Sequence, residues 1–153
     1  MKSLIIYKSI HHKNTQRIAI VMAKILNADL ISPEKVNFNN LKNYDLFGFG
    51  SGIYFSAHHE SLFKLLDDIP QMKGKKAFII TTSGTWEIRL LNDFNTPLKK
   101  KLKEKGFNVI GIFTCRGFDS FGLTKYIGGL NKGRPNEDDI KKAQEFAEKL
   151  IGT

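Results

Sequence analysis

The sequence predicts an α/β fold, a three-layer α/β/α sandwich built on a parallel sheet of five strands. Short apolar runs alternate along the chain with stretches whose apolar residues recur at helical spacing, and this alternation is typical of βαβ units. The chain has 153 residues, of which 41% are hydrophobic and 25% charged, which suits one globular domain and is too short for two of ordinary size. We therefore expect a single domain over residues 1–153.

The first half of the chain supplies three of the expected strands. Residues 4–7 form an apolar run that predicts a buried strand, and the apolar spacing over residues 18–26 predicts an amphipathic helix. Residues 30–31 predict a weak second strand, and residues 45–50 predict a third. Apolar side chains within residues 62–66 then indicate a short helix.

The second half supplies the remaining two strands and two helices. Residues 77–81 and 109–113 are apolar runs that predict the fourth and fifth strands, and a lysine-rich helix that Gly106 ends lies between them. A final helix follows Asn136, which is a favourable N-cap residue. Three acidic residues after this cap suit the positive end of the helix dipole.

The composition narrows the class of protein. Lys and Arg number 24 against 15 Asp and Glu, and the formal charge of +9 raises nucleic acid, a membrane surface or an acidic protein as partners. No nucleic-acid-binding motif accompanies the basic run at residues 99–105, and no apolar run approaches the ~18 residues of a membrane span. The single cysteine, Cys115, excludes an internal disulfide, so a reducing cytoplasm is the expected location. We therefore expect no nucleic-acid partner and no membrane span.

Four loops follow the carboxyl ends of the expected strands, where ligands bind in an open parallel sheet. They span residues 8–15, 51–59, 82–89 and 114–122. Small hydroxyl and amide side chains in these loops suit an anion, and their aromatic side chains suit a flat ring. These aromatic residues are Tyr54, Phe55, Trp86 and Phe118.

The first loop leads directly into a helix, and a helix N-terminus is a favourable place for a phosphate. The loop lacks the Gly-Lys-Ser/Thr ending of a Walker A motif, and no G-x-G-x-x-G follows the first strand. Asn14 and Thr15 could equally be simple helix caps. The pairs His11-His12 and His58-His59 lack a nearby Cys or carboxylate cluster, so no metal site is expected.

In their order along the chain, these loops resemble those of the flavodoxin family. Ser9, Asn14 and Thr15 match positions of that family's phosphate loop, whereas Lys13 replaces its glycine and His11-His12 replace threonines. Residues 50–55 and 82–86 resemble the loops that cover the two faces of the flavin. Residues 128–137 are similar to the ending of a flavodoxin-like branch from bacteria and archaea of anaerobic habitats.

The resemblance implies a strand order of 2-1-3-4-5 and a non-covalent FMN that carries one or two electrons between redox partner proteins. It also implies a monomer. The implied phosphate site comprises Ser9, Ile10, His11, His12, Lys13, Asn14 and Thr15. The implied faces and edge of the flavin site comprise Gly52, Ile53, Tyr54, Phe55, Thr82, Ser83, Gly84, Thr85, Trp86, Cys115, Gly117 and Asp119.

Three functions stay open at this point. The first is an electron carrier whose basic surface docks an acidic partner. The second is a small flavin-dependent oxidoreductase on the same fold, acting on NAD(P)H, a quinone or a protoporphyrinogen-type compound. The third is a flavodoxin-like module that has lost FMN, and Lys13 is its only indication, because a lysine is strained where a turn needs positive φ. We expect the carrier.

Overall fold

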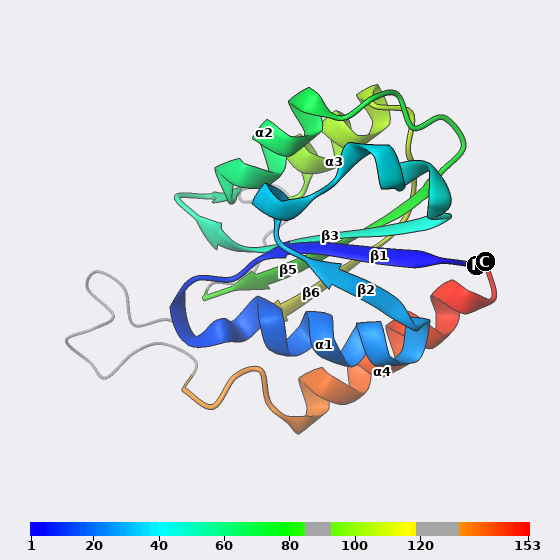
Figure 1. Cartoon of the computed structure of the whole chain (residues 1–153). Coiled ribbons are helices and arrows are strands. Elements are labelled where there is room, and N and C mark those ends of the chain that lie inside the picture. The colour runs from blue at the N-terminus through cyan, green and yellow to red at the C-terminus, as the bar shows by residue number, and fades with distance from the viewer. Residues whose placement is uncertain (85–92, 119–131) are drawn as a thin grey trace.

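Five parallel strands form the central sheet in the order β2-β1-β3-β5-β6 (Figure 1). The computed structural model describes residues 1–84, 93–118 and 132–153. The strands are β1 (Ser3–Lys8), β2 (Ala28–Ile31), β3 (Leu46–Tyr54), β5 (Lys76–Ser83) and β6 (Asn108–Arg116). This arrangement confirms the predicted fold class and the predicted strand order.

A sixth strand, β4 (Ala57–His58), corrects the prediction that residues 51–59 form a loop. β3 continues to Tyr54, and β4 returns antiparallel to it, with Tyr54 opposite Ala57. The two residues between them, Phe55 and Ser56, have φ angles of 51° and 65°. Such a two-residue turn with positive φ is normally marked by Asn-Gly or Asp-Gly, so this hairpin carries no local sequence signal.

Helices cover both faces of the sheet (Figure 1). α1 (Asn14–Leu26) and α4 (Glu137–Ile151) lie together on one face, and α2 (Glu60–Asp68) and α3 (Thr96–Glu104) lie on the other. The short 3-10 helices are η1 (His11–Lys13), η2 (Pro33–Lys35) and η3 (Phe38–Asn43). None of the helices in the described ranges is both long enough and apolar enough to span a lipid bilayer.

The hydrophobic core has two parts, one on each face of the sheet. Alternate residues of β1 point to opposite faces, so Ile5 packs with α1 and α4, whereas Ile6 packs with α2 and α3. Phe47 and Phe49 of β3 join Phe107 in edge-on aromatic contacts on the α2–α3 side. The strands are thus buried on both faces, which explains why they appear in the sequence as short apolar runs.

The start of α4 is as predicted. The side chain of Asn136 accepts a hydrogen bond from the Asp139 backbone N–H at 3.0 Å, and the Asp139 carboxylate accepts one from the Asn136 N–H at 2.9 Å. The Arg134 guanidinium donates to both oxygens of the same carboxylate, at 2.8 and 2.9 Å. This capping box satisfies the Asn136 and Asp139 N–H groups from within the chain.

Candidate functional site

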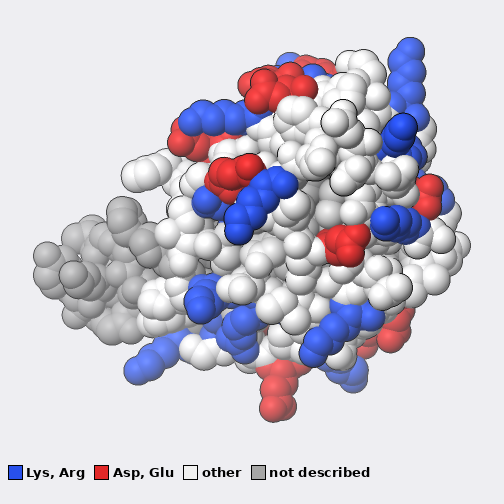
Figure 2. All heavy atoms as spheres, viewed as in Figure 1, with Lys and Arg blue, Asp and Glu red and all other residues white. Residues whose placement is uncertain are grey.

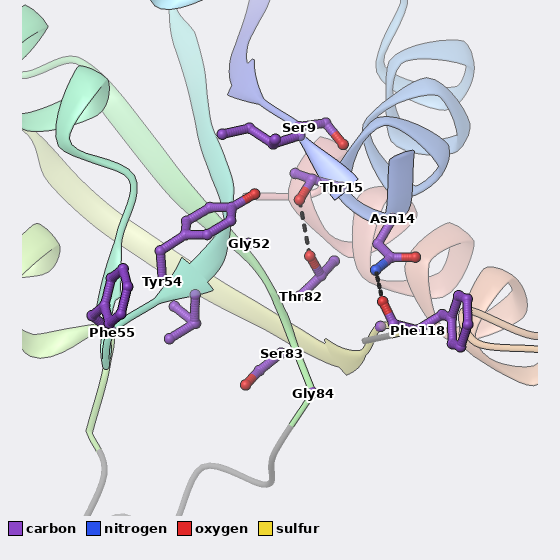
Figure 3. Close-up of a pocket in the computed structure, with 13 residues that line it drawn as sticks. Ser9, Asn14, Thr15, Gly52, Tyr54, Phe55, Thr82, Ser83, Gly84 and Phe118 are labelled. Carbon is purple, nitrogen blue, oxygen red and sulfur yellow. Dashed lines mark hydrogen bonds between the residues drawn. The ribbon is translucent and has the colours of Figure 1, made fainter. Parts of the chain in front are cut away.

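A cavity of about 330 Å³ opens where the predicted loops meet, at the carboxyl ends of the strands (Figure 3). Twelve of the predicted site residues line it: Ser9, Ile10, Asn14, Thr15, Gly52, Ile53, Tyr54, Phe55, Thr82, Ser83, Gly84 and Gly117. Phe118 lines it as well, although the sequence indicated it only as one aromatic residue of its loop. Residues that are far apart along the chain therefore share one pocket.

Three of the other predicted residues, His12, Lys13 and Cys115, do not line the cavity. The side chains of His12 and Lys13 are exposed outside the cavity lining, and Cys115 is buried near the end of β6. Burial raises the pKa of the Cys115 thiol to about 12, so this side chain remains a neutral thiol near pH 7. Thr85, Trp86, Asp119 and the side chain of His11 lie outside the described residues.

The N-terminus of α1 faces this cavity, and side chains cap its first turn only sparsely. Within the described residues, no side chain caps it at the N-cap position and no acidic residue occupies its first turn. Only the Ser9 hydroxyl accepts from this turn, at 3.3 Å from the Gln16 nitrogen. The contrast with the self-capped α4 is direct, because an uncapped helix N-terminus attracts an anion from outside the chain.

The turn that leads into α1 is held in a left-handed conformation. His12 and Lys13 have φ angles of 56° and 53°, so the lysine does adopt the conformation for which glycine is best suited. A residue with a Cβ atom loses roughly 1–2 kcal/mol in this region. The turn therefore keeps its shape at an energetic cost, which is common where backbone geometry serves a ligand.

Hydrogen bonds join this turn to the loops after β5 and β6. The hydroxyls of Thr15 and Thr82 lie 2.9 Å apart, and the Asn14 amide donates to the Phe118 carbonyl at 2.8 Å (Figure 3). A Cβ atom at Gly117 would lie 2.5 Å from Asn14 Nδ2, so only glycine allows this approach. These contacts hold the start of α1, the end of β5 and the segment after β6 together as one side of the cavity.

The two aromatic residues of the β3–β4 hairpin differ in their placement. Tyr54 is partly buried and its ring lies across Gly52, with the hydroxyl directed toward the loop of Ser9 and Thr15 (Figure 3). Burial raises the pKa of Tyr54, and a hydrogen bond with the Ile10 backbone acts in the opposite direction. Phe55 lies at the tip of the hairpin and is 93% exposed. Tyr54 is therefore the aromatic residue that enters the cavity from this side.

A buried polar network centred on His58 lies beneath the hairpin, and no sequence pattern indicated it. The Nδ1 of His58 lies 2.8 Å from Ser51 Oγ, and its Nε2 lies 2.8 Å from Asn95 Oδ1 and 3.3 Å from Thr81 Oγ1. Thr81 also donates to Asn95 Oδ1 at 2.5 Å. All four residues are at most 3% exposed. Their separation along the chain conceals the cluster from local sequence patterns.

The network assigns the protonation of His58. Asn95 Oδ1 is an acceptor, so we place the proton of the neutral ring on Nε2. Nδ1 is then an acceptor that faces Ser51 Oγ, whose one proton lies between this nitrogen at 2.8 Å and the Gly52 carbonyl at 2.7 Å. Burial lowers the pKa of His58 to about 4. Although Ser51, His58 and Asn95 include the residue types of a catalytic triad, the side chain of Ser51 is fully buried and has no access to a substrate.

Within the part of the chain that the structure describes, no group of three His, Cys, Asp or Glu side chains is arranged to hold a metal ion. The two histidines of the second pair have other roles. His58 belongs to the buried network, and His59 Nδ1 accepts from the Ser61 N–H at 3.1 Å, which caps α2.

Comparison with known proteins gives one family. The profile of the flavodoxin domain matches residues 4–117. An uncharacterized protein of Methanocaldococcus jannaschii is 53% identical over 151 residues, which cover 99% of both chains.

Solved structures share the fold at low identity. A flavodoxin from the domain Archaea aligns with a TM-score of 0.75 at 15% identity, over 99% of this chain and 97% of its own. Flavodoxin 2 of Bacillus cereus aligns with a TM-score of 0.74 at 21% identity, over 99% of each chain. Rubredoxin oxygen:oxidoreductase of Desulfovibrio gigas aligns with a TM-score of 0.71 at 14% identity, over 96% of this chain and 34% of its own.

Replacing Lys13 by glycine should stabilise the free protein. Glycine adopts positive φ without a Cβ clash, and its greater flexibility in the unfolded chain offsets part of the gain, so we expect the free energy of unfolding to rise by about 0.5–1 kcal/mol. Urea denaturation measures this change. Lys13→Ala is the control, since it removes the charge and keeps the Cβ atom. An equal gain in both variants would show that charge, rather than backbone conformation, is responsible.

The stability of the protein should depend on pH through His58. The folded state resists protonation down to about pH 4, whereas the unfolded chain takes up the proton near the ordinary pKa of 6.5. The stabilisation is therefore complete above about pH 6.5, and about 3 kcal/mol is lost as the pH falls from there toward 4. Urea denaturation at several pH values should give a shallower slope for His58→Asn than for the native protein. Parallel slopes would contradict the assignment.

Proposed function

The chain belongs to the flavodoxin domain family, and on that basis we propose that it binds FMN non-covalently in the cavity and carries electrons between partner proteins. The observation that carries this proposal is the uncapped N-terminus of α1, which faces a cavity that also holds an aromatic ring and several hydroxyl groups. Bound FMN would supply the chemistry, the acceptance and release of one or two electrons.

The described residues fit the parts of FMN. A phosphate would take the backbone N–H groups at the start of α1 together with the hydroxyl of Ser9 and that of Thr15. Tyr54 would pack on the flavin ring from the hairpin side, and the loop Thr82–Gly84 would border it from the other. Because Asn14 and Thr15 are hydrogen-bonded to the loops after β6 and β5, the phosphate site and the ring site would keep a fixed distance.

The cavity lining favours a carrier over an enzyme with its own substrate. Among the described residues that line it, Tyr54 is the one titratable side chain, and burial raises its pKa. These residues therefore offer no side chain suited to general acid–base catalysis near pH 7, which would assist proton transfer to a small-molecule substrate. Rapid reduction of the loaded protein by NADPH alone would instead favour the oxidoreductase.

We also propose an acidic docking surface on the partner. Lys13 and Arg17 are exposed at the start of α1, beside the cavity, and neither forms an ion pair with a described carboxylate. On the face that Figure 2 shows, basic side chains are otherwise dispersed among acidic ones rather than gathered in one patch. The cations beside the cavity would therefore orient an approaching acidic partner more than the net charge alone would.

Removing the Ser9 hydroxyl should weaken FMN binding selectively. Fluorescence titration of the free protein with FMN and with riboflavin, which lacks the phosphate, separates the two parts of the site. We expect Ser9→Ala to raise the dissociation constant for FMN about tenfold, the worth of one hydrogen bond to a charged group, and to leave riboflavin unchanged. Ser3→Ala, at the other end of β1, is the control. Failure of the native protein to bind FMN would refute the proposed function.

The rate at which small reductants reduce the FMN-loaded protein should depend on the two exposed cations beside the cavity, Lys13 and Arg17. We expect an anionic donor, dithionite, to react several-fold more slowly as ionic strength rises from about 0.01 to 0.3 M, and cationic reduced methyl viologen to react faster. Stopped-flow absorbance measures both rates. The double variant Lys13→Gln, Arg17→Gln should flatten the dependence, while Lys99→Gln, Lys100→Gln on α3 should preserve it. The same salt dependence in both double variants would show that Lys13 and Arg17 have no greater effect than distant lysines.

A further inference from the structure

Two walls of the cavity rest on one buried imidazole. The hairpin wall, Gly52–Phe55, lies between Ser51 and His58 along the chain. The second wall, Thr82–Gly84, begins directly after Thr81. His58 Nδ1 lies 2.8 Å from Ser51 Oγ, and His58 Nε2 lies 2.8 Å from Asn95 Oδ1. The Thr81 hydroxyl donates to the same Asn95 oxygen. The ring therefore bridges the base of one wall and the base of the other.

The side chain of Asn95 contributes to this bridge and does not cap α3. Asn95 is the N-cap residue of α3, and Asn is among the best residues for that role. The side chain oxygen instead accepts from His58 and Thr81. The chain thus forgoes a local stabilising contact to keep the buried network complete.

The hairpin would otherwise be weakly held. β4 has two residues, and the turn before it places Phe55 and Ser56 at positive φ, where side chains are strained. Ser51 Oγ accepts from the His59 N–H at 3.0 Å and contacts His58, so the returning strand is joined to β3 by side chains as well as by the sheet. The position of Tyr54 depends on this attachment.

We propose that His58 is a positioning residue that holds the two walls in their orientation beyond the paired residues Ser51 and Thr81, and thereby sets the affinity of the cavity for a flavin ring. The proposal rests on the proposed function, because it names a flavin ring as the group between the walls. Each ring nitrogen has a separate part: Nδ1 secures the hairpin through Ser51, and Nε2 secures the second wall through Asn95 and Thr81.

Two substitutions separate these parts. Asparagine places its oxygen near the position of Nδ1, so His58→Asn keeps an acceptor for Ser51 and loses the bond to Asn95. Glutamine places its amide nitrogen near the position of Nε2, so His58→Gln keeps a donor for Asn95 and loses the bond to Ser51. The control is Ser3→Ala at the far end of β1, which also changes a buried polar side chain but leaves the network and the cavity lining intact.

The experiment measures FMN and riboflavin affinity by fluorescence titration, well below the unfolding temperature of each variant. We expect both His58 variants to bind both flavins about tenfold more weakly, by a similar factor, because the walls contact the ring and not the phosphate. Ser3→Ala should stay within about twofold of the native protein. Weakening of FMN alone, or affinities within about twofold for folded His58 variants, would overturn the proposal.

A second readout uses the free protein. In amide NMR spectra, His58→Asn should shift the signals of Ser83 and Gly84 more than those of Ile53 and Tyr54, and His58→Gln should do the reverse. Identical shift patterns would overturn the division between the two nitrogens. This comparison needs no cofactor, so a native protein that binds no flavin would refute the proposed function while the role of His58 in joining the walls is still decided.

If either His58 variant fails to fold, Ser51→Ala and Thr81→Val test the same bridge from its two ends. Each removes one hydroxyl at nearly constant volume. We expect each to weaken binding of both flavins several-fold, and the double variant to lose less than the product of the two, since either change alone already releases one wall. Losses that multiply independently would overturn the bridge.

Discussion

Parallel pairing between the strands is the constraint on which the whole site depends. Lys8 of β1 pairs with Ser51 of β3, Ser51 with Thr81 of β5, and Thr81 with Thr114 of β6. All four strands therefore reach the same level before their loops begin. Because parallel strands run in one direction, four loops that are distant along the chain emerge in one row, and a pocket forms between them.

The pleat of β5 then divides the work between the two faces of the sheet. Successive side chains of a strand point to opposite faces, so Thr81 and Thr82 reach different networks. Thr82 meets Thr15 on the α1 side, and Thr81 meets His58 and Asn95 on the α3 side. The end of β5 is thereby held by hydrogen bonds on both faces of the sheet.

The parts of this structure that the sequence predicted are those with local causes. Buried strands appear as apolar runs, and the cap of α4 follows from Asn136 and the acidic residues after it. The loops that form the cavity followed from strand ends and from family resemblance. β4 was missed because Phe55-Ser56 lacks the usual turn residues, and the contact between His58 and Asn95 spans 37 residues, so no local pattern reveals it. The sequence could not predict whether Lys13 has a positive φ, because the identity of a side chain does not determine the backbone conformation.

The unequal ends of α1 and α4 have a consequence for the life of the protein in a cell. α4 begins in a capping box made by its own chain, whereas α1, within the described residues, has no side-chain cap at its N-cap residue and faces the cavity. A ligand that binds only the folded state adds to its stability in proportion to the logarithm of its concentration. With FMN as that ligand, scarcity of flavin would raise the unfolded fraction and expose the chain to proteolysis, so that the amount of this protein would follow the supply of its cofactor.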